Sequence, residues 1–277
     1  MPELPEVETV CLALSKILNN SKVSNIKIFR KDLRWTIKDN LELDLKEKIL
    51  KKPFRRGKYI LIPTSKAHIL LFHLGMSGTI KILSGEYKVI KHDHVKINIE
   101  TEDNNYFTIV YNDPRRFGYI DFFHVSKIKN HFLLKKLGVE PFEKEFTIEY
   151  LQKKIYNKSK CVKNFLMDQS IIAGIGNIYA NEILYKANIS PLRTVDKLNK
   201  EHLKSIIVAT KFILKKSINA GGTSIRNHLQ PDGKLGYFVQ KLNVYGKNKS
   251  KCNKCNNVIV LININNRSTY YCSNCQR

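Results

Sequence analysis

Long apolar runs are missing from this 277-residue sequence. No stretch approaches a membrane-spanning helix, which needs about 18 apolar residues. The N-terminus carries Glu3 and Glu6 where a secretion signal carries lysine or arginine, so it does not resemble a signal peptide. These absences argue against a membrane-embedded or secreted protein, and we expect a cytoplasmic one.

Acidic residues are also scarce. The chain has 24 aspartates and glutamates against 48 lysines and arginines, a formal charge of +24, and no acid follows Asp232. Such a charge opposes compaction unless a polyanion neutralises it, and each neutralised nucleic-acid phosphate releases counterions. Nucleic acid is therefore the leading partner class. An AT-rich coding background or attraction to acidic membranes would also explain the charge.

The chain has only six cysteines. In a cytosolic protein, cysteines are more often free thiols or metal ligands than partners in disulfide bonds. Four of them form two Cys-x-x-Cys pairs separated by sixteen residues, which fits a four-cysteine zinc site. Four cysteine ligands leave no open coordination position, so the pattern predicts one structural Zn²⁺; redox pairs or unrelated thiols are the alternatives. We expect no organic cofactor. The predicted ligands are Cys252, Cys255, Cys272 and Cys275.

The order of sequence patterns predicts an α+β protein. Apolar residues recur at helical spacing from Glu6 to Leu18, and seven strand-like segments follow up to residue 125 without intervening helices, as in an antiparallel β-sandwich. From Thr147 to about Ala220 the spacing is helical, with Thr147 and Asp196 as expected caps. The predicted domains are a helix and sandwich at 1–135, a linker at 136–146, a helical domain at 147–237 and a zinc ribbon at 238–277.

The first residues, Met-Pro-Glu, allow two interpretations. Proline and negative charge both suit the first turn of a helix, and on residue types alone this structural role is favoured. If Met1 is removed, however, Pro2 becomes a free secondary amine with a pKa near 8, far more nucleophilic at neutral pH than a lysine side chain. Glu3 beside it could then act as a general acid.

Motifs along the whole chain resemble those of the formamidopyrimidine-DNA glycosylase family. These motifs are MPELPEVET at the start, RRGKYIL at 55–61, HLGMSG at 73–78, DPRRFG at 113–118, GIGNIYANEIL at 174–184, GGTSIRNHLQPDGKLGYF at 221–238 and the terminal cysteine ribbon. The resemblance implies a helix–two-turns–helix DNA-binding domain and a base-excision-repair enzyme. Such an enzyme removes oxidised purines, 8-oxoguanine and formamidopyrimidines, from duplex DNA and nicks the strand by β- and δ-elimination. Two alternatives stay open: an endonuclease VIII-like preference for oxidised pyrimidines, and a non-catalytic DNA-binding module.

The resemblance also implies the catalytic residues. Pro2 matches the nucleophile that forms a Schiff base with the sugar, and Glu3 matches the acid that helps to open it. Lys58 matches the lysine used in β-elimination, although its type alone suggests a solvated strand lysine. Arg267 matches the zinc-hairpin arginine linked to the second elimination and to phosphate contact.

Base flipping requires side chains that fill the vacated stack and engage the orphaned base. By resemblance these are Met76, Arg115 and Phe117, although a methionine or phenylalanine by itself is more often a core residue. The loop around Thr223–Asn227 would close over the flipped base. We expect a monomer that binds duplex DNA in the nucleoid, with no membrane and no obligate protein partner. The implied phosphate contacts are His92, Lys158, Lys163 and Asn177.

Overall fold

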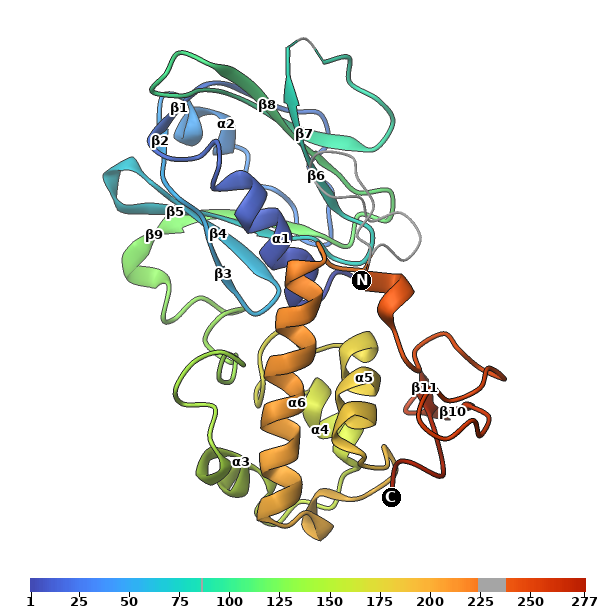
Figure 1. Cartoon of the computed structure of the whole chain (residues 1–277). Helices are drawn as coiled ribbons and strands as arrows, with labels where there is room; N and C mark the ends of the chain where they lie inside the picture. The colour runs from blue at the N-terminus through green and yellow to red at the C-terminus, as the bar shows by residue number, and fades with distance from the viewer. Residues whose placement is uncertain (86, 224–237) are drawn as a thin grey trace. The chain divides into compact units, whose positions relative to one another are not determined.

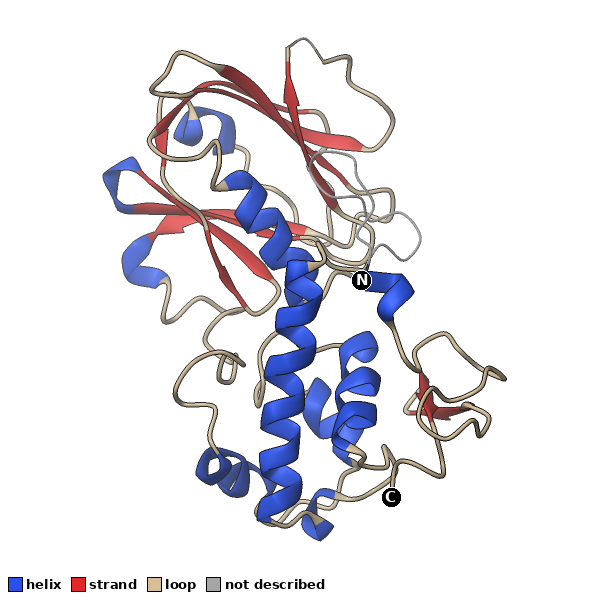
Figure 2. Cartoon of the chain, viewed as in Figure 1, coloured by secondary structure: helices blue, strands red, loops and turns tan. Residues whose placement is uncertain are grey.

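The computed structural model describes residues 1–85, 87–223 and 238–277. The chain divides into two compact units, Met1–Lys135 with Ala220–Val239, and Lys136–Asn219 with Gln240–Arg277. The first unit carries the long strands and the second carries most of the helices (Figure 1, Figure 2). The domain limits predicted at 135, 146 and 237 stay predictions. No helix in the described part of the chain is long and apolar enough to cross a membrane.

The first unit begins with helix α1, Leu4–Leu14. Glu3 is its N-cap residue, Pro5 lies in its first turn, and the backbone N–H of Glu3 donates to Oε2 of Glu6 at 2.9 Å. This reciprocal capping arrangement satisfies N–H groups that a helix start leaves unpaired. The inner face of α1 is buried against strands β3, Phe54–Arg56, and β4, Tyr59–Thr64. Its residues Val7, Val10 and Leu14 belong to the core.

Among the described residues of this unit, the sheet has nine strands, all paired antiparallel, in the order β6-β8-β7-β1-β2-β4-β5-β9 with β3 on β4. Strand β2 is only two residues long, and its Leu50 pairs with Ser21 on one side and Thr64 on the other. The strands are β1 Ser21–Ile28, β2 Ile49–Leu50, β3 Phe54–Arg56, β4 Tyr59–Thr64, β5 His68–His73, β6 Thr79–Ser84, β7 Asp93–Glu100, β8 Tyr106–Asn112 and β9 Tyr119–His124.

The two halves of this sheet form two layers around one core (Figure 1). Ile97 and Ile109 from one half and Ile60, Leu70 and Ile120 from the other belong to the same buried cluster. The predicted antiparallel sandwich is therefore confirmed, with β2 as the strand that joins its layers. The sequence patterns missed β2, β3 and the short helix α2, Leu41–Leu45, because elements of two to five residues carry little periodicity.

The second unit is a helical module with an appended hairpin. Thr147 caps α3 as predicted, since its Oγ1 accepts from the N–H of Tyr150 at 3.1 Å. Asp196 was wrongly predicted as a cap: Asn199 caps α6 instead, accepting from the N–H of His202 at 2.9 Å. Asp196 lies in a separate 3₁₀ turn. The elements are α3 Ile148–Ile155, α4 Val162–Met167, α5 Asn177–Ala187, α6 Lys200–Asn219, β10 Val260–Ile264 and β11 Arg267–Tyr271, with 3₁₀ turns at Ser65–Ala67, Val125–Lys127, Val195–Lys197 and Phe238–Lys241.

Candidate active site

The N-terminal segment has features of both roles that its sequence allows, the start of a helix and an active site. Met1 is 48% exposed, whereas Pro2 and Glu3 are buried and Glu3 is only 2% exposed. Glu3 does cap α1, but capping a helix requires no such burial of a carboxylate. The acid is held inside the unit, next to the end of the chain where a freed Pro2 amine would lie.

Charged side chains surround this chain end. Burial lowers the pKa of the terminal amine below its ordinary value, and the charges of Lys58 and Arg115 lower it further. The carboxylates of Glu3 and Glu6 act in the opposite direction. Three residues predicted for the site, Glu3, Lys58 and Arg115, are thus close enough to the terminus to influence its protonation. A lowered pKa increases the nucleophilic, unprotonated fraction at neutral pH.

Lys58 lies with Gly57 in the tight turn between β3 and β4. Gly57 adopts φ of +58°, and the lysine that follows it is only 7% exposed. Lysines are almost never buried unless they are paired. The structure therefore excludes the solvated strand lysine that its residue type suggests and places the side chain in the interior near the chain end.

His73 is a residue of this site that the sequence patterns did not single out. It ends β5, its ring lies 4.8 Å from that of Tyr59, and its Nδ1 accepts the N–H of Gly75 at 3.3 Å. Burial lowers the pKa of His73 to about 4, with further lowering by Lys58 and Arg34 and an opposing effect of Asp113. The imidazole is therefore neutral at pH 7, so it adds no positive charge beside Lys58.

This histidine should make stability depend on pH. An unfolded histidine has a pKa of about 6.5, so between pH 6.5 and 4 the unfolded chain binds more protons than the folded one. Stability is fully present above this window and is lost as the pH falls through it, by about 2–3 kcal/mol. We expect His73→Asn to show a smaller loss in urea midpoint between pH 7 and 4.5. The control is His124→Asn, which changes an exposed histidine. An equal loss of urea midpoint in the parent and in His73→Asn would contradict the expected role of His73.

Glu6 is a second residue that the motif assignments overlooked. It is 3% exposed, and its Oε1 accepts from the N–H of Thr223 at 2.8 Å and from the Thr223 hydroxyl at 2.7 Å. At Gly222, with φ of +79°, an added Cβ would lie 3.1 Å from the same oxygen. Glu6 thus anchors the start of the predicted lesion loop to α1. Residues 224–227 of that loop lie outside the described residues.

The predicted void-filling residues lie on two neighbouring loops. Met76 follows β5 and is 42% exposed, and Phe117 precedes β9 and is 41% exposed. The guanidinium of Arg115 lies 4.7 Å from the centre of the Phe117 ring. Neither Met76 nor Phe117 is a core residue, which removes the alternative suggested by their residue types. His92 lies half-buried on a third loop, with φ of +73°.

The predicted phosphate contacts of the second unit differ in accessibility. Lys158 is exposed just after α3. Lys163 is fully buried, and its Nζ donates to the Ser268 carbonyl at 3.0 Å and to Oγ1 of Thr269 at 2.7 Å. Nδ2 of Asn177, at the start of α5, donates to the same Ser268 carbonyl at 3.0 Å. Lys163 therefore holds the hairpin strand that begins with exposed Arg267, and a direct phosphate contact by Lys163 stays a prediction.

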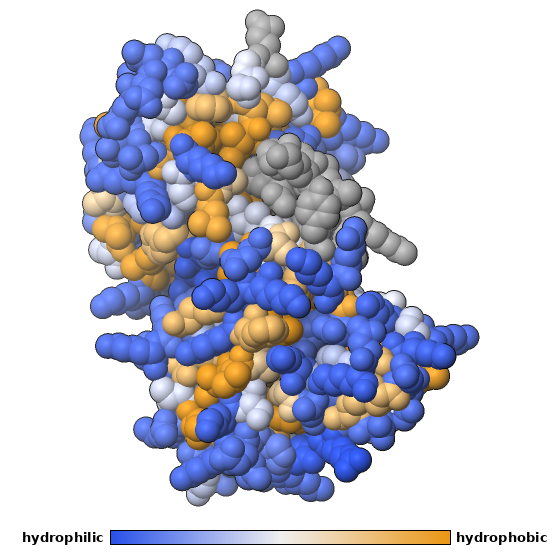
Figure 3. Space-filling model, viewed as in Figure 1, coloured by the Kyte–Doolittle hydropathy of each residue, from blue (hydrophilic) through white to orange (hydrophobic). Residues whose placement is uncertain are grey.

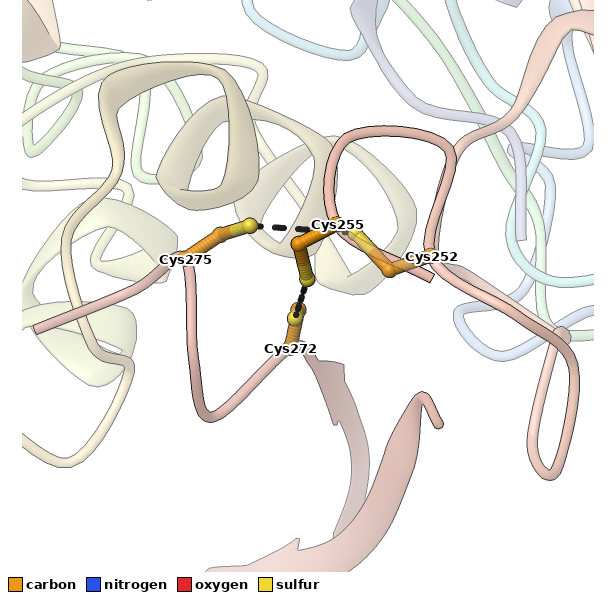
Figure 4. A group of neighbouring side chains, drawn as sticks. All are labelled: Cys252, Cys255, Cys272 and Cys275. Carbon is orange, nitrogen blue, oxygen red and sulfur yellow. Dashed lines mark hydrogen bonds between the residues drawn. The ribbon is translucent and has the colours of Figure 1, made fainter. Parts of the chain in front are cut away.

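The four predicted zinc ligands come together at the base of the hairpin, and their side chains converge (Figure 4). All four sulfurs lie within 4.8 Å of one another, with Cys252–Cys275 at 3.8 Å and Cys255–Cys272 at 3.5 Å. Zn–S bonds of about 2.3 Å in a tetrahedron place sulfurs about 3.8 Å apart, so the cluster fits the ion.

The surroundings of Cys252 favour the form of its side chain that binds a metal. Burial raises the pKa of the Cys252 thiol, but the Tyr185 hydroxyl at 3.2 Å and the backbone N–H of Lys254 at 3.4 Å favour the thiolate, so that the pKa falls to about 6. Metal binding requires the thiolate form. The four cysteines hold one structural zinc.

The face of the molecule in Figure 3 is covered mainly by hydrophilic side chains in both units. A terminal amine with charged neighbours, a helix–two-turns–helix arrangement of α4 and α5 and a four-cysteine zinc hairpin together define a class, the zinc-ribbon DNA repair glycosylases. Three family models match the chain. They are the formamidopyrimidine-DNA glycosylase N-terminal domain at residues 1–120, the H2TH domain of the same glycosylase at 137–228, and a zinc finger found in FPG and IleRS at 249–277.

Curated relatives and solved structures agree with the family models. The formamidopyrimidine-DNA glycosylases of Xanthomonas oryzae pv. oryzae and Ruthia magnifica are 42% and 43% identical, each over 100% of both chains. A Lactococcus lactis Fpg mutant in complex with Fapy-dG-containing DNA matches with a TM-score of 0.91 and 31% identity over 100% of both chains. The Lactococcus lactis complex with abasic-site DNA matches at 0.90 and 30% over 99% of both. The chain belongs to the formamidopyrimidine-DNA glycosylase family, and it is a DNA glycosylase of base excision repair.

Proposed function

We propose that this glycosylase is bifunctional. It removes 8-oxoguanine and formamidopyrimidines from duplex DNA through a Schiff base on Pro2, and it then cleaves the strand as an abasic-site lyase. The observation that carries this proposal is the burial of Pro2, Glu3 and Lys58 beside the chain end, where burial and the charges of Lys58 and Arg115 lower the pKa of the Met1 amine. The chain carries Met1, so this chemistry starts after Met1 is removed.

The proposed steps follow from the residue types. The Pro2 nitrogen attacks C1′ of the damaged nucleotide, the bond from C1′ to the base breaks, and the base leaves with the proton that the Pro2 nitrogen gives up. Glu3 protonates the ring oxygen as the sugar opens, which leaves an iminium ion at C1′. In the β-elimination that follows, a proton is lost from C2′ and the C3′–O bond breaks. Lys58 takes part in this step. A second elimination breaks the C5′–O bond, with Arg267 acting on the phosphate.

The remaining predicted residues would bind the DNA. Met76 and Phe117 enter the space that the flipped base leaves, and Arg115 donates hydrogen bonds to the orphaned cytosine. Lys158, Asn177 and His92 bind phosphates, which positions the strand without reading its sequence. The loop that begins at Thr223 would cover the flipped base.

Duplex DNA with an oxidised purine or an abasic site is the proposed partner. The solved relatives in complex with Fapy-dG DNA and with abasic-site DNA support this assignment, and so does the charge of +24. The protein would act as a monomer in the cytoplasm, bound to the nucleoid, since one chain carries every proposed catalytic residue.

A comparison of lesions tests the substrate class. A wild-type Lactococcus lactis enzyme has been solved with oxidised-pyrimidine DNA, so both lesion classes belong in the comparison. We expect kcat/KM for 8-oxoguanine and formamidopyrimidine opposite cytosine to exceed that for an oxidised pyrimidine by about tenfold or more. The reverse order would show an endonuclease VIII-like specificity. Tight binding with no strand cleavage on any duplex would overturn the lyase assignment.

A further inference from the structure

One fully buried carboxylate, that of Asp113, connects the loops that carry the proposed DNA-contacting residues of the first unit. Asp113 is 0% exposed and directly follows β8. Its Oδ1 accepts from the Ser77 hydroxyl at 2.6 Å and from the N–H of Arg115 at 3.3 Å. Its Oδ2 accepts from the N–H of Gly118 at 2.8 Å and from the Tyr111 hydroxyl at 3.1 Å. The side chain therefore ties the loop of Met76 to the loop of Arg115 and Phe117.

The backbone of Asp113 extends this connection to a third loop. Its N–H donates to the carbonyl of His92 at 3.1 Å, and its own carbonyl lies 2.7 Å from Nε2 of the buried His94. Met76, His92, Arg115 and Phe117 thus come from three loops that meet at a single residue. None of these contacts was apparent from the DPRRFG motif, in which the arginine and phenylalanine draw attention first.

The loops are also in close backbone contact around this carboxylate. The Ser77 oxygen that donates to Asp113 accepts the N–H of Arg115 at 3.1 Å, which closes a ring of three residues. At Gly75, with φ of +62°, an added Cβ would lie 2.4 Å from the carbonyl carbon of Phe117. The backbone at Gly75, just before Met76, therefore lies in close contact with the backbone of Phe117. With the hydrogen bonds of Asp113 formed, the two loops have little freedom to move relative to each other.

We propose that Asp113 is a positioning residue for base extrusion, because it sets Met76, Arg115 and Phe117 in the mutual arrangement that fills the vacated stack. This role rests on the proposed function. Met76 and Phe117 are 42% and 41% exposed, so the hydrogen bonds of Asp113 hold in place side chains that face outward. An ordinary core contact would instead fix side chains that are already buried.

The test compares Asp113→Asn with Asp121→Asn. Each carboxylate oxygen of Asp113 accepts hydrogen bonds from two donors. In Asp113→Asn an NH2 group replaces one of these oxygens, and this group would face two donors and could accept from neither. Asp121 is a matched control in the same unit. It is 7% exposed, and its carboxylate pairs with His131 at 3.1 Å and with Lys38 at 2.7 Å, neither of which belongs to these loops.

Two substrates separate positioning from chemistry. On 8-oxoguanine opposite cytosine, we expect Asp113→Asn to slow single-turnover excision about 10²-fold, as for a misplaced reacting group. On a preformed abasic site there is no base to extrude, and we expect strand cleavage within about threefold of the parent. The fluorescence rise of a 2-aminopurine beside the lesion, which reports unstacking, should slow with excision. Asp121→Asn should change none of these rates by more than about threefold.

Ser77→Ala provides a milder variant in case Asp113→Asn fails to fold. It removes one donor from the carboxylate and should slow excision about tenfold while sparing abasic-site cleavage. Equal losses on both substrates, or unchanged excision in both variants, would overturn the positioning role. A wild-type protein that cleaves neither substrate would instead show that the proposed function is wrong, and the positioning role falls with it.

Discussion

A Glu3→Gln protein is expected to bind lesion-containing duplex as tightly as the parent and to release the base about 10³-fold more slowly, within the range typical of a lost general acid. Glutamine has the same shape and can still accept a hydrogen bond as the cap of α1, so the helix start should survive. What it cannot supply is a proton at the opening sugar. Single-turnover excision at saturating enzyme measures this step without the contribution of binding.

Glu8→Gln is the matched control for this substitution. Glu8 lies on the same helix but forms an ion pair with Nε of Arg55 at 2.7 Å, and its side chain is 28% exposed. We expect this control to excise within about threefold of the parent. If Glu3→Gln were as fast as Glu8→Gln, the buried carboxylate at the chain terminus would be only a helix cap.

Loss of zinc is expected to abolish tight DNA binding while the first unit stays folded. The hairpin core consists mainly of Val244, Cys252, Ile259 and Cys272 beside Tyr185, too little apolar surface to fold without metal. Structural zinc supplies about 10–16 kcal/mol in comparable sites, so Cys272→Ser should unfold the hairpin that carries Arg267. We expect a loss of affinity of about 100-fold or more at constant salt.

The chain offers both a reporter and a control for this experiment. Trp35 is the single tryptophan, and it packs against Tyr119 at 5.1 Å within the first unit, so its fluorescence reports the folding of that unit alone. Cys161→Ser changes the N-cap residue of α4 to a good capping residue and leaves the zinc ligands intact. Metal analysis verifies that the zinc is lost. If the affinity for DNA is then unchanged, the result would contradict a DNA-binding role for the hairpin.

The fold could be predicted largely from local patterns. Alternating strands, helical spacing and the Thr147 cap each depend on residues close in sequence, and the structure confirms them. The zinc cluster could also be predicted from the sequence, because each Cys-x-x-Cys pair fixes two ligands on one turn. The Asp196 prediction was wrong for a related reason: two possible caps, Asp196 and Asn199, lie three residues apart, and the local pattern does not distinguish them.

The site itself depended on contacts between distant residues, which local patterns do not encode. Nothing near Lys163 in the sequence indicates that its ammonium is enclosed by Ser268 and Thr269, more than a hundred residues away. Likewise, Glu6 meets Thr223 and Asp113 meets Ser77 only because the chain folds back on itself. The motif resemblance identified which residues to examine, and the structure shows what holds them in place.

The most direct test of this account is borohydride trapping on a duplex with one 8-oxoguanine opposite cytosine, followed by mass mapping of the cross-linked peptide. We predict a covalent adduct on an N-terminal Pro2 with Met1 absent. We also predict no adduct on the fraction of protein that retains Met1. An adduct on Lys58 or another lysine, or no adduct on a duplex that stays tightly bound, would contradict the assignment of the chain terminus as the nucleophile.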